Sequence, residues 1–180
     1  MINFITGLPQ AVEVDGSSFF INTDFRYWLL FDKLIRKGGA TYRDISFVLE
    51  KPEEINKAVF KKLMEFYLNK NTTPHSNGNN ESNIPIMDYE QDGEFIYASF
   101  RRYYNINLLT DKLHWHEFLG LLRGLFNDYK DIVGYRSYSG DDKDYIKLRN
   151  SWSLDIVDNT TDEQRRLIDI LKTDGDLTRL

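Results

Sequence analysis

The stretch Ala11-Val12-Glu13-Val14-Asp15-Gly16-Ser17-Ser18-Phe19-Phe20-Ile21-Asn22 decides how the chain begins to fold. Two short runs flank Asp15-Gly16, a dipeptide that favours a two-residue type I′ turn, so the stretch predicts a β-hairpin over 11–22. Pairing across this turn places Val12 opposite Phe19 and turns Phe20 to the other face. Because two strands alone are marginally stable, the hairpin must rest on helices or on another sheet edge.

A helical pattern follows the hairpin, capped by Thr23 or Asp24 and ended by Gly38-Gly39. One arc of this helix is apolar and consists of Tyr27, Trp28, Phe31, Leu34 and Ile35, whereas Arg26, Lys33 and Lys37 lie opposite. Phe25, Leu29 and Leu30 fall outside that arc. A helix with apolar residues on more than one side is central or touches a second body.

Further patterns of helical period cover most of the remaining chain. We expect a short helical or mixed segment over 42–50 and helices over 53–69, 92–104, 111–126, 129–135, 142–154 and 162–171. Thr110 is the expected cap of the helix over 111–126. The apolar arc of that helix contains His114, Phe118, Leu121, Leu122 and Leu125. The predicted fold class is therefore α+β, predominantly α, with the N-terminal hairpin packed on a bundle of about six to seven helices.

The length of 180 residues predicts a single helical domain over 1–180 with the hairpin at its N-terminus. Residues 69–83 are rich in Asn, Ser and Thr and carry no large apolar side chain, which predicts a flexible insertion over 69–91. Its exit, over 84–92, is expected to be ordered or semi-ordered. The last residues, 173–180, are expected to fray.

Charge and composition exclude several classes of protein. The chain has 23 basic and 28 acidic residues, so its net charge is −5, which argues against a general nucleic-acid binder. It contains 0 Cys, which removes disulfides and thiolate chemistry. No apolar run reaches the roughly 18 residues of a membrane span, and Met1 to Gly7 lacks the pattern of a secretory signal. We expect a cytosolic protein.

Two local patterns suggest metal binding but lack the spacing that it requires. A helical zinc motif needs a second His four positions after the first, but Gly120 stands there after His116 in the string His114-Trp115-His116-Glu117. Two His separated by two positions point apart on a helix. We therefore expect a partly buried His114 and an exposed His116. Asp141-Asp142-Lys143-Asp144 lacks the ligand order of a calcium loop and instead suits a helix start. We therefore predict no catalytic residues, no metal and no cofactor.

Two other patterns concern partners. Arg101-Arg102-Tyr103-Tyr104 could bind a phosphate backbone and stack on bases, but the acidic total and a predicted core position for Tyr103 argue against it. Gly120 and Gly124 lie four apart on one helix, a spacing that permits close approach of another backbone, inside the molecule or at an interface.

Several strings together resemble a bacteriophage protein family, named for gene product fifteen of Gram-positive siphophages. They cover about residues 8 to 150, in an order and combination that are more specific than any one of them. The strings are Leu8-Pro9, Val12 to Gly16, Ile21 to Arg26, Tyr97-Ala98-Ser99-Phe100, Tyr104 to Leu108, Leu113-His114-Trp115, Leu121 to Leu125, and Ile132 with Gly134-Tyr135-Arg136.

The resemblance implies a non-enzymatic tail assembly chaperone, since members are encoded in the tail-morphogenesis region near the tape-measure gene. It implies the tape-measure protein as client and the tail-tube protein as a further partner, in the host cytoplasm and outside the mature virion. The alternatives are a structural tail or connector subunit and a small regulatory DNA-binding protein. A homo-oligomer is compatible with each, and no membrane is expected.

A chaperone for a long helical client needs exposed apolar surface with weak, reversible contacts. The sequence offers two candidates for such a partner-binding surface. One is the extra apolar side formed by Phe25, Leu29 and Leu30, and the other is the face of Gly120 and Gly124. Either set could instead lie in the core or at a surface between copies of the chain.

Overall fold

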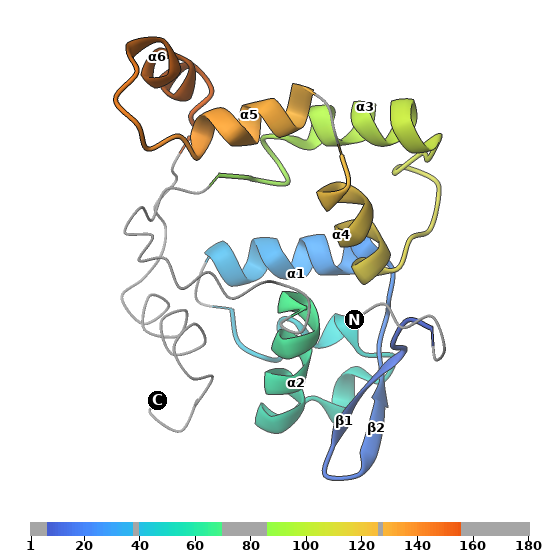
Figure 1. The fold of residues 1–180 in the computed structure, drawn as a ribbon. Helices are drawn as coiled ribbons and strands as arrows, with labels where there is room; N and C mark the ends of the chain where they lie inside the picture. Colours follow the sequence, from blue (N-terminus) through green and yellow to red (C-terminus); the bar gives the residue numbers. More distant parts are fainter. Residues whose placement is uncertain (1–6, 38–39, 70–85, 126–127, 156–180) are drawn as a thin grey trace. The chain divides into compact units, whose positions relative to one another are not determined.

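The computed structural model describes residues 7–37, 40–69, 86–125 and 128–155 (Figure 1). Within these ranges the protein has a two-stranded antiparallel sheet followed by helices, which confirms the predicted α+β, predominantly helical class. The strands are β1 (Ala11–Val14) and β2 (Ser17–Phe20). The α-helices are α1 (Phe25–Lys37), α2 (Lys57–Leu68), α3 (Gly93–Tyr104), α4 (Trp115–Arg123), α5 (Asp128–Arg136) and α6 (Lys143–Ser151).

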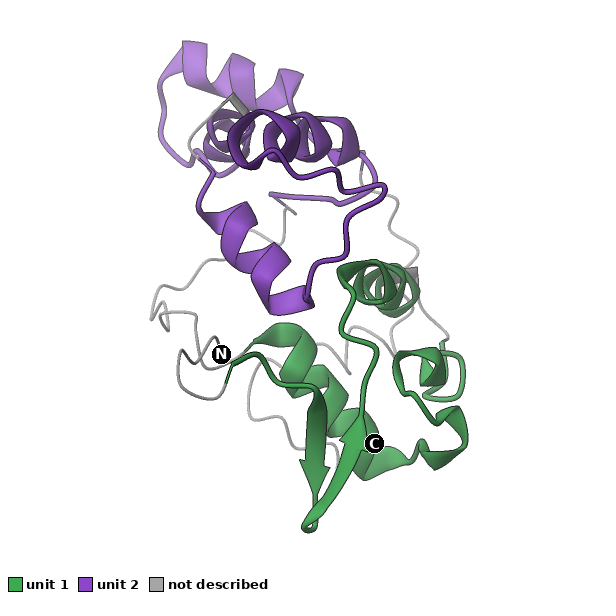
Figure 2. Cartoon of the chain, turned by 90° about the vertical axis from the view of Figure 1, so that its right-hand side faces the viewer, with its two compact units in different colours: residues 1, 3–71, 157–180 green, residues 2, 72–156 purple. Residues whose placement is uncertain are grey.

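The chain divides into two compact units (Figure 2). The described part of unit 1 lies between residues 7 and 69 and contains the hairpin, α1 and α2, whereas that of unit 2 lies between 86 and 155 and contains α3 to α6. The single domain over 1–180 stays a prediction. The predicted helix 162–171, the fraying end 173–180 and most of the insertion 69–91 lie outside the described residues.

The hairpin forms in the predicted register. Asp15 and Gly16 both have positive φ, 50° and 80°, as a type I′ turn requires, and Val12 pairs with Phe19. Val12 is buried, whereas Phe20 on the opposite face is 57% exposed. Glycine is required at the second turn position because side chains rarely adopt its backbone conformation.

The hairpin rests on two supports, as its marginal stability demands. Helix α2 packs against β1. Beyond β2, Ile21 forms an antiparallel bridge with Leu49, the Asn22 amide donates to Val48 O at 2.8 Å, and the Glu50 amide donates to Phe20 O at 3.1 Å. The segment 48–50 thus continues the sheet for a few residues, and it follows a short 3₁₀ turn at Ser46–Val48 in the region predicted as mixed.

The core of unit 1 is centred on aromatic rings of α1 and α2. Trp28 and Phe31 are fully buried, with ring centroids 5.3 Å apart, and Phe66 lies 4.5 Å from Trp28. The Trp28 indole donates to Asn22 O at 2.8 Å, which ties the helix to the end of the hairpin. A buried carboxylate, Asp32, accepts hydrogen bonds from the Tyr67 hydroxyl of α2 and from Arg36 one turn along α1.

The predicted apolar arc of α1 is divided by the structure. Trp28 and Phe31 are buried as expected, but Tyr27 is 42% exposed, and Leu34 and Ile35 are half-buried. Phe25, which the helical projection placed off the arc, is itself buried. The sequence left open whether this residue lies in the core, and the structure places it there.

Helix α2 begins later than predicted. Pro52–Glu54 forms a separate 3₁₀ turn, and Asn56 then caps α2 by accepting the Val59 amide at 3.0 Å. The helix ends at Leu68, and the next residue, Asn69, is its C-cap with a left-handed φ of 47°.

In unit 2, α4 begins later than predicted, at Trp115 and not at Asp111. Thr110 does not cap a helix at Asp111, because Asp111 instead accepts the Asn107 amide at 2.8 Å and closes a turn with it. Such side-chain turns compete with helical hydrogen bonds. The helix begins at Trp115, with His114 as its N-cap residue.

Stacked rings fill the centre of unit 2. Phe118 stacks on Phe100 at 5.4 Å and on Trp115 at 5.8 Å, and Tyr89 lies 6.2 Å from both Trp115 and Phe118. Ile96 and Phe100 are buried on α3. Helix α6 starts after Asp142, whose carboxylate accepts the amides of Asp144 and Tyr145, so the acidic cluster serves a helix start as expected.

Tyr103 was placed in the core by the sequence pattern and is instead 46% exposed, with the Arg102 guanidinium 5.4 Å from its ring centre. Its neighbour Tyr104 takes the inward position, and the Tyr104 hydroxyl donates to Leu121 O at 2.9 Å. Among the described residues, none of the helices has the length and apolar character that a membrane crossing requires.

The Phe31→Ala variant tests the core of unit 1. Removing this fully buried ring should lower the free energy of unfolding by about 3–5 kcal/mol. Leu30→Ala, one position away and largely exposed, is the control and should change it by about 0.5 kcal/mol or less. Urea denaturation followed by circular dichroism measures both, and equal losses would contradict the assignment of Phe31 to the core.

Candidate functional site

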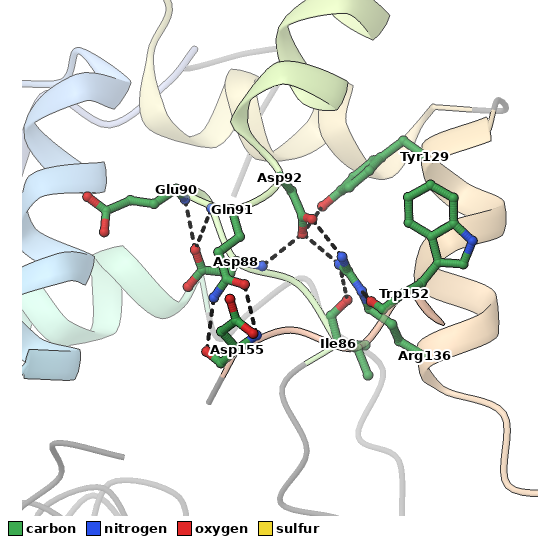
Figure 3. Close-up of polar contacts among 9 residues, drawn as sticks. All are labelled: Ile86, Asp88, Glu90, Gln91, Asp92, Tyr129, Arg136, Trp152 and Asp155. Atoms are coloured by element: carbon green, nitrogen blue, oxygen red, sulfur yellow. Dashed lines mark hydrogen bonds and ion pairs between the residues drawn. The ribbon is translucent and has the colours of Figure 1, made fainter. Parts of the chain in front are cut away.

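Among the described residues of unit 2, the most deeply buried ion pair joins Asp92, just before α3, to Arg136, at the end of α5 (Figure 3). The guanidinium meets the carboxylate with two parallel hydrogen bonds, Nη1 to Oδ2 at 2.7 Å and Nη2 to Oδ1 at 2.8 Å. Asp92 is 1% exposed and Arg136 is 7% exposed. This bidentate geometry is the strong form of an arginine–carboxylate pair.

Both partners also bind backbone groups of other segments. Arg136 Nε donates to Trp152 O at 2.6 Å, and Nη1 donates to Ile86 O at 3.3 Å. Asp92 Oδ2 accepts the Asp88 amide at 3.0 Å. We call this set, Asp92 and Arg136 with the backbone of Ile86, Asp88 and Trp152, the Arg136 clasp.

Tyr129 of α5 adds a hydroxyl to the clasp. It is buried, and its hydroxyl donates to Asp92 Oδ2 at 3.4 Å. Burial, with the negative charge of Asp92 next in weight, raises the pKa of the Tyr129 hydroxyl well above its ordinary value. The hydroxyl therefore stays protonated at neutral pH and serves as a hydrogen-bond donor.

A second polar link lies beside the clasp. The Gln91 side-chain amide binds the backbone of Asp155 in both directions, donating to its carbonyl at 3.1 Å and accepting its amide at 2.9 Å (Figure 3). The Asp88 carboxylate accepts the amides of Glu90 and Gln91, each at 2.9 Å, and shapes the turn that precedes α3. This turn is ordered, so the end of the predicted flexible insertion, 86–91, is fixed by hydrogen bonds.

The clasp and the Gln91 link bring together the first and last described segments of unit 2, 86–92 and 152–155. The Asp92 carboxylate and the Arg136 guanidinium face each other and are shielded from water, which is an arrangement that holds chain segments in place. Sequence reasoning missed this cluster, because Asp92 and Arg136 are 44 positions apart and no local pattern pairs them.

His114 and His116 do not point apart as a continuous helix would require. His114 lies outside the helix as its N-cap, its Nδ1 accepts the His116 amide at 3.0 Å, and the two ring centres are 5.3 Å apart. His116 is 3% exposed, so the prediction of an exposed ring was wrong, since the helix starts later than expected. Within the described ranges, no three side chains of the metal-binding types gather to hold an ion.

The predicted partner-binding residues lie at different depths in the structure. Phe25 is buried, Leu29 is half-buried and Leu30 is 47% exposed, so the three do not line one open wall. Gly120 and Gly124 are both exposed. A Cβ atom at Gly124 would lie 3.1 Å from the Tyr104 hydroxyl, so this glycine already permits a close contact inside unit 2. Partner binding by these residues stays a prediction.

The exposed apolar side of α1 is formed by different residues. Tyr27, Leu30 and Leu34 follow i, i+3 and i+7 spacing and share one face, which we call the outer stripe. Tyr27 and Leu30 are both more than 40% exposed, and the Tyr27 ring stacks on Phe47 with centroids 6.3 Å apart. Only Leu30 of the predicted trio belongs to it.

Comparison with known families decides the identity of the chain. A family model described as "Bacteriophage Gp15 protein" matches residues 4–154. The chain belongs to the bacteriophage Gp15 family. No curated protein and no solved structure matches this Gp15 protein. The matched range includes the outer stripe and every residue of the Arg136 clasp, so both features lie in the part that defines family membership.

Removal of the clasp arginine should destabilise this Gp15 protein strongly. Arg136→Gln leaves the Asp92 carboxylate buried without its counter-charge, and we expect a loss of about 3–5 kcal/mol in the free energy of unfolding. Tyr129→Phe, which removes only the 3.4 Å bond, should cost about 1 kcal/mol or less. Thermal and urea unfolding of the full chain measure both, and similar small losses would show that the pair contributes little.

The Tyr129 hydroxyl should make stability fall at alkaline pH. Its pKa is raised on folding, so its contribution is complete below the ordinary value of 10.0 and is lost as pH rises past that value, when the unfolded chain releases the proton and the folded chain keeps it. The difference in unfolding free energy between the wild type and Tyr129→Phe should therefore shrink from pH 9 to pH 11. Urea titrations at several pH values measure this, and a constant difference would contradict it.

Proposed function

We propose that this Gp15 protein is a non-enzymatic tail assembly chaperone that binds the phage tape-measure protein while the tail is being built. It acts in the host cytoplasm, releases its client as tail-tube subunits assemble, and is absent from the mature virion. Membership of the Gp15 family supports a phage role. The finer assignment follows from what the resemblance implies, which is that members are encoded in the tail-morphogenesis region near the tape-measure gene.

The observation that carries the proposal is the exposed apolar surface of α1. Tyr27 and Leu30 stand on a helix whose other side is anchored by the buried Trp28 and Phe31, so the surface is held by a rigid element. Apolar residues at helical spacing on a firm support fit the apolar stripe of a client helix. Modest exposed area also suits contacts that another protein must displace.

The use of charge in unit 2 supports a binding role as well. In the Arg136 clasp, the guanidinium that pairs with Asp92 also donates hydrogen bonds to the carbonyls of Ile86 and Trp152, and so holds those segments in place. A rigid unit of this kind presents surfaces to a partner without rearranging its own core.

A small regulatory DNA-binding protein is the second candidate, and one observation favours it. Arg101, Arg102 and Tyr103 are all exposed on α3, so the predicted core position of Tyr103, which argued against this role, does not hold. An exposed arginine over an exposed ring is compatible with backbone contact and base stacking. The net charge of −5 still opposes it.

Co-expression with a fragment of the tape-measure protein from the same phage tests the proposal. The fragment should remain soluble and co-purify when this Gp15 protein is present, and should precipitate when it is absent. Precipitation in both cases would refute a chaperone role. Mass spectrometry of purified virions should find the protein absent, whereas abundant copies would assign it to the tail or connector.

Binding to duplex DNA is a separate readout for the second candidate. A gel-shift assay at moderate salt should show no complex, and a complex that weakens as salt is added would favour the regulatory DNA-binding role instead. Arg101→Ala with Arg102→Ala would then abolish the complex.

A further inference from the structure

Arg136 contacts two segments of unit 2 that lie far apart in the sequence (Figure 3). Its Nη1 atom donates to Ile86 O at 3.3 Å, and its Nε atom donates to Trp152 O at 2.6 Å. A guanidinium is planar and rigid, so its nitrogen atoms cannot move independently of one another. Since two further bonds fix it on Asp92, a shift that breaks the contact with one carbonyl also changes the contact with the other.

The first of these segments, residues 86–88, depends on the ion pair for its position. Ile86 is 44% exposed. The Asp88 amide donates at 3.0 Å to Asp92 Oδ2, the oxygen that also binds the guanidinium. The next residue, Tyr89, is held differently, because its ring lies against the aromatic rings at the centre of the unit. The segment can therefore move while the residue after it stays in place.

The second segment, residues 152–155, combines one buried side chain with bonds that face water. Leu154 is 8% exposed and anchors the segment on unit 2. The Gln91 side chain binds the Asp155 backbone in both directions, but both residues are exposed, so water competes for these two bonds. The bond from Arg136 is the more shielded polar contact, because the guanidinium is buried.

The cost of opening favours release of both segments together. Arg136 is 7% exposed and Asp92 is 1% exposed. If residues 152–155 lifted alone, the Nε donor would lose its carbonyl while 86–88 still shielded the guanidinium, and a buried donor without an acceptor costs free energy. Release of both segments admits water to the whole guanidinium and removes that cost. Openings of this kind are local and leave the rest of a domain folded.

We propose that residues 86–88 and 152–155 form a two-part strap that opens and closes as one unit, with Arg136 as the residue that couples the two parts. A partner that displaces one part of the strap therefore frees the other. This conformational device goes beyond the proposed function, because the coupling is a property of unit 2 and needs no particular client.

Hydrogen–deuterium exchange of the full chain, followed residue by residue by NMR, tests the strap. Leu154→Ala removes the apolar anchor of the second part, so exchange of the Asp155 amide and, through the coupling, of the Asp88 amide should each become faster by about tenfold or more. The Phe118 amide of α4 should keep its wild-type rate. Leu148→Ala, at a 36% exposed position of α6, is the matched control and should change none of the three rates.

Two results would overturn the proposal. An Asp88 amide that keeps its wild-type rate in Leu154→Ala, or that is unprotected in the wild type, would show that the two parts move independently. Equal acceleration at Phe118 would show that the whole unit unfolds and that no separate strap exists.

Ile86→Gly tests the coupling from the other part of the strap. Glycine gains more chain freedom than isoleucine when the segment is released, so this variant favours the open strap. Because coupling between two sites is reciprocal, exchange of the Asp155 amide should become faster by about twofold to fivefold. Ile86→Ala changes the same exposed side chain with a smaller gain in chain freedom and should have a smaller effect. An Asp155 rate that Ile86→Gly leaves unchanged would contradict the coupling.

Gln91→Ala separates the role of Arg136 from that of the direct link. The variant removes the two bonds between Gln91 and Asp155 and leaves the bonds of Arg136 in place. Leu154→Ala, added to this background, should still accelerate exchange at Asp88 as it does in the wild type. If the acceleration at Asp88 disappears, the Gln91 link carries the coupling and the assignment to Arg136 is wrong.

Discussion

The buried pair of Asp92 and Arg136 determines how unit 2 is closed. It joins the residue before α3 to the last residue of α5, and through the carbonyls of Ile86 and Trp152 it holds the segments at both ends of the described unit. Such a pair is costly to bury and is stable only because two carboxylate oxygens, one guanidinium and several backbone groups satisfy one another. The rings of Phe100, Trp115 and Phe118 then supply the apolar packing that the clasp alone could not.

Unit 1 depends on a different arrangement, in which one apolar face of α1 is buried and a neighbouring apolar face is partly exposed. Trp28 and Phe31 anchor it to α2, and the indole of Trp28 ties it to the end of the hairpin. The neighbouring stripe, Tyr27, Leu30 and Leu34, receives less cover. An anchored helix with an uncovered apolar stripe connects the stability of the unit to its proposed use, since the residues that hold the helix are separate from those offered to a partner.

Local patterns predicted the elements with local causes. Asp15-Gly16 needs positive φ at both positions and so determined the turn and the pairing of Val12 with Phe19. Asp142 capped α6 because a carboxylate satisfies the first amides of a helix. Two of the failures come from competition between nearby groups. Asp111 closed a turn with Asn107, so α4 began at Trp115, and Tyr104 took the inward position that periodicity assigned to Tyr103.

By itself, the sequence determined the hairpin register, the helical class and membership of the Gp15 family, because turn chemistry, capping and hydrophobic period act over a few residues and family strings need only order along the chain. Tertiary structure alone decided the pairing of Asp92 with Arg136, the burial of Phe25 and His116, and the exposure of Tyr27 and Leu30. The physical reason is that burial is a property of what packs against a side chain, and those neighbours come from segments tens of residues away.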